Sequence, residues 1–278
     1  MVRYEMCPSL GGKQEKQGGS QAMWKGRIPI EEAPYWYNTP IEKLDFEWSR
    51  EEKVEIERYC AKILKNIEEE GGMTPLERWK AAMWGKPKDR MVMGIHTANT
   101  YITRTMDGFS DAMKPIDVYR YPKIWVKAHL ATVARFGLDY ANQHAINYGE
   151  DMWGGQSKMI EYGNPIMSGP PPIKTMEDTE GIPIPDPYKD GLYPGYLWAF
   201  REYRRILDEY KIPLPVWGSI CVGPTLTVMM CMMGWAEFAI GLRKNPELVR
   251  RCLDLSTEWL IRYGKAQIDT YQPDGLYC

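Results

Sequence analysis

The sequence lacks the features that mark several specialised classes of protein. It has no excess of charge of either sign, because 35 lysines and arginines stand against 37 aspartates and glutamates. A near-neutral chain gives no reason to expect nucleic acid or an anionic membrane as a partner. Its six cysteines form no Cys-x-x-Cys pair and no regular spacing, which favours a reducing cytoplasm.

The chain also has little that would place it in or across a membrane. Its first residues include Arg3 and Glu5 and lack the apolar core of a signal peptide. Residues 212–236 carry no charge and are long enough to span a bilayer, but prolines such as Pro213 and Pro215 would break a spanning helix. We therefore expect no membrane-spanning segment and a cytoplasmic protein.

What is present in this uncharged stretch is the start of a β/α unit. Residues 214–221 have the composition of a short buried strand of a parallel sheet. A Gly-Pro turn at 223–224 follows, and residues 225–233 and 235–242 have helical composition. Methionines crowd the first of these segments, and we expect them to serve packing rather than to form the wall of a cofactor site.

A long amphipathic helix is expected to begin at Asn245, whose side chain can cap the free amides, with Pro246 in the first helical position. Apolar residues then recur at spacings of three and four, which predicts one buried face. The residues of that face are Leu248, Cys252, Leu255, Trp259, Tyr263 and Ala266. Pro-Asp-Gly at 273–275 ends the helix, and residues 276–278 begin another strand.

The first half of the chain contains further helix signals. Residues 49–70 form a charged helix that ends at Gly71-Gly72, and the capping box that starts at Thr74 begins a second helix over 75–84. Two more helices are predicted over 121–136 and 197–210, and a strand over 91–96. The Pro- and Gly-rich residues 157–195 suggest a surface excursion, and the aromatic residues 35–37 suggest packing across another surface.

The order of these elements resembles the uroporphyrinogen decarboxylase superfamily. Its members share a strand that ends in a Gly-Pro turn, a helix that ends before an Asn/Asp-Pro start, and a long helix that leads to a strand opening with Asp and Gly. The matching residues here are Gly223-Pro224, Asn245-Pro246-Glu247, Lys265-Ala266-Gln267-Ile268 and Asp274-Gly275. Pro87-Lys88-Asp89-Arg90 also resembles the loop before the family's first barrel strand.

The resemblance implies an α/β fold of the (β/α)₈ TIM-barrel type. It runs over residues 74–278 and covers only the first four β/α units, the N-terminal half of the domain, while residues 1–73 form an N-terminal extension with a charged helix. We expect a truncated or split chain, or a stop codon that is read through. Because a half barrel leaves an open strand edge and an uncovered inner face, we expect it to pack against a complementary half-barrel chain or another copy of itself.

Two departures from the decarboxylase pattern decide between branches of the superfamily. Decarboxylases carry an Arg-Gln-Ala-Gly-Arg stretch at the first strand, whereas residues 96–101 read His-Thr-Ala-Asn-Thr-Tyr. The place of the catalytic aspartate holds Ile146, with Glu150 and Asp151 four and five residues further on. The chain is thus more similar to the methyltransferase branch, the methylcobamide:coenzyme M methyltransferases and related corrinoid-dependent demethylases.

That branch implies Zn²⁺ and a corrinoid carried by a small partner protein. The family's zinc ligands, a His-x-Cys pair and a later cysteine, lie in the second half of the barrel, so no metal ligand is expected in this chain. We expect a methyltransferase component that moves a methyl group between a corrinoid protein and a small-molecule methyl donor or thiol acceptor. The alternatives are a uroporphyrinogen-type decarboxylase and a non-catalytic half barrel that scaffolds a partner.

Barrel active sites lie at the carboxyl ends of the strands, which selects the candidate site residues. We expect His96, Asn99, Asn142, His144 and Ser219 to bind substrate. A histidine at a strand end can equally be a hydrogen-bonded structural group, so that reading stays open. Cys221 follows the same strand as Ser219, and we expect it to be a small core residue. No residue is assigned a catalytic role.

Overall fold

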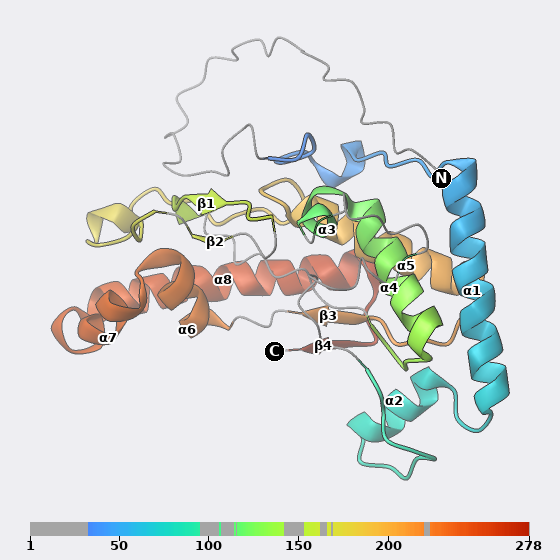
Figure 1. The fold of residues 1–278 in the computed structure, drawn as a ribbon. Coiled ribbons are helices and arrows are strands. Elements are labelled where there is room, and N and C mark those ends of the chain that lie inside the picture. Colours follow the sequence, from blue (N-terminus) through green and yellow to red (C-terminus); the bar gives the residue numbers. More distant parts are fainter. Residues whose placement is uncertain are drawn as a thin grey trace.

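The computed structural model describes residues 33–94, 106, 114, 116–141, 153–161, 166–167, 169–219 and 223–277 (Figure 1). The α-helices are α1 (Arg50–Glu70), α2 (Pro75–Met83), α3 (Asp117–Arg120), α4 (Pro122–Phe136), α5 (Tyr193–Glu209), α6 (Pro224–Thr227), α7 (Trp235–Lys244) and α8 (Pro246–Tyr271). The strands are β1 (Ser157–Lys158), β2 (Ile166–Met167), β3 (Trp217–Ser219) and β4 (Gly275–Tyr277). The described residues also contain two 3₁₀ turns, Ile41–Lys43 and Glu177–Thr179, and a π-helical turn, Val228–Met232.

Capping boxes start both of the first two helices, and the sequence predicts the one at Thr74. The Thr74 hydroxyl accepts a hydrogen bond from the Glu77 amide, and the Glu77 carboxylate accepts one from the Thr74 amide at 2.8 Å. Ser49 and Glu52 make the same reciprocal pair at the start of α1. These bonds satisfy amides that a helix start leaves free, so local sequence sets both helix starts.

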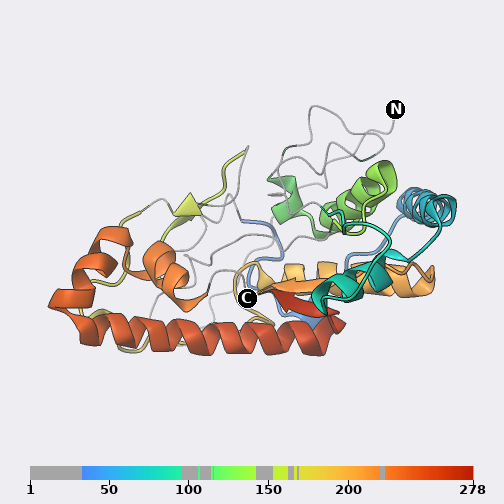
Figure 2. The same ribbon diagram turned by 90° about the horizontal axis from the view of Figure 1, so that it is seen from below.

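The long helices form a row that covers one side of the molecule (Figures 1 and 2). α1 packs on α4, α4 on α5, and α5 on α8. The fully buried ammonium of Lys127 in α4 donates to the Glu55 carboxylate of α1 at 2.9 Å. Trp48 also donates to Glu202 of α5 at 2.6 Å. The predicted N-terminal extension is thus packed directly against the helices of the barrel.

The aromatic residues before α1 pack within the same chain. Trp36 is buried, and its indole nitrogen donates to the Arg120 carbonyl at 2.8 Å. Its ring lies over Gly195 so closely that a Cβ there would meet ring carbons within 3.0 Å. The prediction that this segment packs across another surface is confirmed for Trp36.

The predicted face of α8 is buried along its whole length. Asn245 accepts from the Leu248 amide, as expected of an N-cap. All six residues predicted for the apolar face are buried. Gln272 then leaves the helix in the left-handed conformation, with φ of +46°, and β4 follows. The helix-to-strand half of this β/α unit is therefore confirmed.

The sheet is shorter than the sequence predicts. β3 and β4 pair in parallel with Trp217 opposite Gly275. Of the strand predicted over 214–221, only Trp217–Ser219 forms a strand among the described residues. The strand predicted over 91–96 is represented in the described residues by one parallel bridge, Gly94 to Tyr140.

The surface excursion predicted over 157–195 is wrong in part. It contains the antiparallel pair β1–β2, and α5 already begins at Tyr193. Ile173 is fully buried, and its amide donates to the Met232 carbonyl at 3.0 Å. Instead of an exposed loop, Pro171 lies beside Gly234 and Ile173 bonds to the π-helical turn.

The methionine-rich segment divides into α6 and a π-helical turn rather than one helix. Cys231 and Met232 are fully buried, and Met229 and Met230 pack against the core, so the packing role predicted for these methionines is confirmed. None of the described helices is by itself long and apolar enough to cross a bilayer. α6 with its π turn meets that measure only together with α7, across a bend of 115°.

Candidate functional site

Two pairs of parallel chain segments share one layer of residues. Gly94 bridges Tyr140, and Trp217 pairs with Gly275. The Tyr140 and Trp217 rings stack at 4.8 Å between centroids, which joins the two pairs. The layer therefore runs from Gly94 through Tyr140 and Trp217 to Gly275, one residue from each segment, as in the interior of a TIM barrel.

The two glycines of this layer make room for the rings. A Cβ on Gly94 would meet the Tyr140 ring closer than the 3.0 Å that real Cβ atoms keep, and a Cβ on Gly275 would meet the Trp79 ring at 2.9 Å. Gly218 faces the other way, toward Gln267 of α8. The layer thus lies on the side of β3 and β4 that looks away from α8.

Trp79 of α2 closes the amino-terminal side of this layer. Its ring lies 5.4 Å from that of Trp217 and is almost fully buried. α2 precedes the first of the four segments and lies beside their amino ends (Figure 2). The layer is therefore the floor of the barrel interior, and a substrate would have to enter from the carboxyl side.

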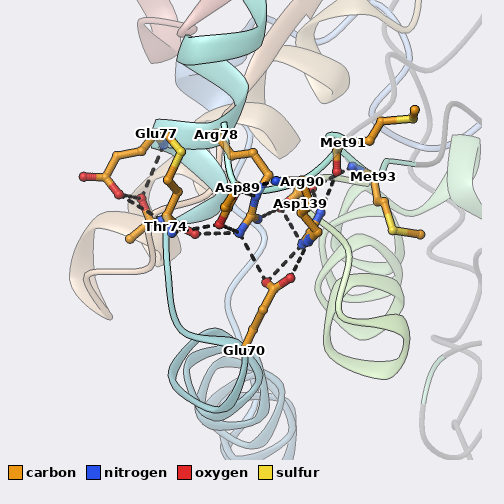
Figure 3. A network of polar contacts seen from close by, with 10 residues as sticks. Glu70, Thr74, Glu77, Arg78, Asp89, Arg90, Met91, Met93 and Asp139 are labelled. Carbon is orange, nitrogen blue, oxygen red and sulfur yellow. Dashed lines mark hydrogen bonds and ion pairs between the residues drawn. The ribbon is translucent and has the colours of Figure 1, made fainter. Parts of the chain in front are cut away.

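A buried ion-pair network lies beside this floor (Figure 3). Arg78 and Asp139 are both fully buried and form an ion pair with each other. The Arg78 guanidinium also donates to Asp89 from Nε at 2.7 Å and from Nη2 at 2.8 Å. Nη2 donates further to the Met73 carbonyl at 2.7 Å. One arginine thus joins the α1–α2 turn, α2, and the segments before Gly94 and Tyr140.

A second arginine completes the network. Arg90 donates to both oxygens of Asp139, at 2.7 and 3.2 Å, and pairs with Glu70 at the end of α1. The Met93 amide donates to Asp139 Oδ2 at 2.6 Å, and the Asp139 amide returns a bond to the Met93 carbonyl at 2.7 Å. Asp139 therefore fixes the register of the first two segments.

The pKa shifts in this network agree with a structural role. Hydrogen bonds from Arg78 hold the pKa of Asp89 well below its usual range, and the same bonds raise the pKa of Arg78. The bonds to Glu70 raise the pKa of Arg90. These groups stay charged at any physiological pH, so none of them is poised to exchange a proton. Their place at the amino ends of the strands also favours stability over catalysis.

The same device recurs at the other strand pair. The Asp274 amide donates to the Val216 carbonyl at 2.7 Å, and the Val216 amide donates to Asp274 Oδ2 at 2.9 Å. Arg204 of α5 donates to that oxygen at 2.7 Å. An aspartate one residue before the paired position, with an arginine behind it, thus fixes the register in both pairs.

Most of the predicted site residues fall outside the described part of the chain. This applies to His96, Asn99, Asn142 and His144, and also to Cys221. Ser219 is the last residue of β3, where its backbone pairs with Tyr277. The structure therefore places Ser219 at the carboxyl end of β3, and it does not test whether the five residues come together or bind substrate.

The described histidine, His129, is structural. It lies fully buried in α4, its Nδ1 is 2.7 Å from the Trp125 carbonyl, and its ring is 3.9 Å from that of Trp125. Burial lowers its pKa from 6.5 to about 3, because the charged form loses its water, and the bond to Trp125 offsets only part of that. His129 is therefore neutral at physiological pH.

This burial predicts a pH-dependent stability. Since the unfolded chain binds the proton below pH 6.5 and the folded chain does not, stability is complete above 6.5 and falls as pH drops toward 3. The loss from this group is about 1.4 kcal/mol per pH unit once the unfolded histidine is charged. Urea denaturation of wild type and His129→Gln between pH 7 and about 5 measures it. Equal slopes in the two proteins would contradict this assignment.

The described cysteines and histidine do not fit a zinc site. Among the described residues, no three His, Cys, Asp or Glu side chains lie close enough to hold a metal ion. Burial raises the pKa of Cys60 and Cys252 to about 12, which is the opposite of what a metal-bound thiolate needs. We therefore derive no step through zinc from these residues.

Sequence reasoning missed the floor of the barrel and its ion pairs. The resemblance included Asp89 and Arg90 in a loop motif but predicted no partners for them. Arg78 and Asp139 were not predicted to have any role. A signal was available, because Asp139-Tyr140 and Asp274-Gly275 both place an aspartate at the start of a strand. Its meaning depends on contacts between residues 61 positions apart, such as Arg78 and Asp139.

Parallel segments that alternate with covering helices, and that share one inner layer, define an α/β protein of TIM-barrel type. The chain belongs to the uroporphyrinogen decarboxylase (URO-D) family, whose sequence profile matches residues 74–271. This agrees with the resemblance drawn from the sequence.

Among solved structures, a methyltransferase from Methanosarcina mazei has a similar fold. The TM-score is 0.58 at 21% sequence identity, and the match covers 71% of this chain and 56% of that one. The chain thus spans little more than half the length of this neighbour. No curated protein matches the chain.

Proposed function

We propose that the protein is a component of a methyltransferase that moves a methyl group between a corrinoid protein and a small-molecule methyl donor or thiol acceptor. The observation that carries this proposal is the likeness of its fold to the Methanosarcina mazei methyltransferase, and the family to which the chain belongs agrees with it. The neutral residues at 96–101 also favour it, since a substrate with many carboxylates would call for arginines there.

The inner layer predicts which residues face the substrate. Side chains alternate along a strand, so the layer above the floor takes the residues two positions further on. Those are His96 after Gly94, Asn142 after Tyr140, Ser219 after Trp217 and Tyr277 after Gly275. We propose that these neutral side chains hold the methyl donor or acceptor by hydrogen bonds.

In this reaction these residues would position the methyl donor and acceptor and exclude water from the site. The methyl group transfers without the bonding electrons of its carbon–heteroatom bond, which stay on the leaving heteroatom. Cobalt(I) of the corrinoid substrate supplies both electrons of the new carbon–cobalt bond. The leaving heteroatom gains a proton, which a hydrogen-bond donor of the site can deliver. The floor of Tyr140, Trp217 and Trp79 closes the amino end of the site against water.

The test is methyl transfer to free cob(I)alamin by the complete enzyme. A panel of O-, N- and S-methyl compounds is offered, and the conversion of cob(I)alamin to methylcobalamin is followed by its absorbance. We expect transfer from at least one class, and loss of that transfer in His96→Ala and Asn142→Ala. Decarboxylation of uroporphyrinogen with no methyl transfer would replace this proposal with the decarboxylase function.

We also propose that further β/α units, from the same or another chain, cover the margins of the described part. At one margin Met91 and Met93 are exposed beside the first segment, and at the other Ile261 and Ile268 are exposed on α8. Apolar residues at both ends of one layer of helices and strands suit a ring that continues on either side.

Exposed margins predict the behaviour of the 278-residue chain in isolation. We expect it to bind the dye ANS and to self-associate in sedimentation experiments. The reason is that an open strand edge has unpaired backbone groups and these margins expose apolar side chains. Replacing Met91, Met93, Ile261 and Ile268 together by serine should reduce both signals. A monodisperse monomer that does not bind ANS would contradict the proposal.

A further inference from the structure

Helix α7 exposes most of its apolar side chains. It buries Phe238 and Gly241, while Trp235 is 61%, Ile240 47% and Leu242 55% exposed. Trp235 and Leu242 are seven residues apart and therefore share one face of the helix. An exposed tryptophan and leucine on one helical face are the kind of anchors by which helices dock onto partner proteins.

The α7 face is held rigidly in place. Gly241 approaches Val249 of α8 so closely that a Cβ there would lie 2.8 Å from the valine side chain. At the other end Gly234, with φ of +83°, turns the chain against Pro171. A surface that is already packed in place loses little conformational entropy when a partner binds. These contacts therefore favour docking of a partner on α7 over movement of α7 toward the core.

Cationic side chains border the same helix. Arg243 and Lys244 end α7, and Arg250 and Arg251 follow in α8; all four are exposed. None of them forms an ion pair with any described residue. Positions 243–251 contain one acidic residue, Glu247, against these four cations. The border therefore offers free positive charge to an acidic surface.

The position of α7 links it to the proposed site. β3 and β4 point their carboxyl ends toward the side on which α6 and α7 lie, where the chain end after β4 is also seen (Figures 1 and 2). The α7 face thus borders the side from which a barrel site is entered.

We infer that the exposed face of α7, with its cationic border, is the docking surface for the corrinoid protein, and that this partner presents an acidic rim around an apolar patch. This inference rests on the proposed function, which requires a second protein to bring its group to the carboxyl ends of the strands. A lipid surface fits less well, because Glu237 and Glu247 stand among the cations and a helix of 10 residues buries little apolar area.

The test compares two methyl acceptors with the complete enzyme. One acceptor is free cob(I)alamin, which needs no docking surface, and the other is the corrinoid protein of the same organism in its cob(I) state. The variants are Trp235→Ala/Leu242→Ala, which removes the anchors, and Arg243→Glu/Lys244→Glu, which reverses the border. Val54→Ala, an exposed apolar residue on α1, is the control.

Both variants are expected to lower kcat/KM for the corrinoid protein by about tenfold or more and to leave that for free cob(I)alamin within about twofold. Higher salt should lower only the rate with the protein acceptor. An unchanged rate with the corrinoid protein overturns the docking surface and leaves the proposed function intact. Variants that lose only their binding to phosphatidylglycerol vesicles, and keep their rate with the corrinoid protein, overturn it as well. A wild-type enzyme that methylates neither acceptor overturns both.

Discussion

Replacement of Asp139 by alanine is expected to lower the free energy of unfolding by about 3–5 kcal/mol. The change removes the carboxylate that pairs with Nη1 of the fully buried Arg78, which keeps its bonds to Asp89, and two hydrogen bonds from Arg90. It also leaves the Met93 amide without the carboxylate that it donates to. The buried Nη1 group cannot regain water without opening the structure, which is why the cost exceeds that of an ordinary hydrogen bond.

Urea denaturation followed by circular dichroism measures this loss, with two companion variants. Asp139→Asn keeps the shape and one acceptor but not the charge, and it should fold with an intermediate loss. Arg262→Ala breaks a pair with Glu258 in which both side chains are about half exposed, and it should cost less than about 1 kcal/mol. If Asp139→Ala costs no more than Arg262→Ala, the network does not hold the register of the strands.

The local signals in the sequence predicted the helices well. The capping box at Thr74 and the cap at Asn245 predicted where α2 and α8 begin. The spacing of apolar residues in α8 fixed which face is buried. These features depend on residues within one or two turns of each other, so their meaning does not change with the rest of the fold.

The strands and the surface of the barrel could be predicted less well, because they depend on distant partners. A proline-rich composition suggested exposure for residues that the π-helical turn covers, as at Ile173. The network around Asp139 likewise needs Arg78 and Arg90 from two earlier segments of the chain. An aspartate before a strand can be seen in the sequence, but the partners of these groups cannot, because they lie in distant segments of the chain.

The candidate site illustrates the same division. Ser219 was expected at a strand end, and β3 ends there. His96 and Asn142 were selected by the rule that barrel sites lie at strand ends, and they lie outside the described residues, so their place above the floor stays a prediction. Tyr277 was not selected from the sequence, because only the pairing of Trp217 with Gly275 gives it the matching position in β4.

The floor of the barrel predicts a large effect for the smallest possible substitution. Gly94→Ala is expected to lower the free energy of unfolding by about 1–3 kcal/mol, as overpacking does. The added Cβ would meet the Tyr140 ring closer than 3.0 Å, and that ring is stacked on Trp217 at 4.8 Å. Either the ring must leave its stack on Trp217 or the strand must shift.

A double-mutant cycle shows whether this clash is the cause. In Tyr140→Ala the ring is absent, so adding Gly94→Ala should cost much less than it does in the wild type, with a coupling of at least about 1 kcal/mol. Gly71→Ala is the control for a glycine whose Cβ would meet nothing within 4 Å, although its φ of +67° adds backbone strain. Because His96 lies two positions beyond Gly94, the shift should also reduce methyl transfer to free cob(I)alamin by more than the loss of folded protein explains. Stability loss without coupling to Tyr140 would mean that the layer is not packed as described, and the positions assigned to His96 and Asn142 would lose their support.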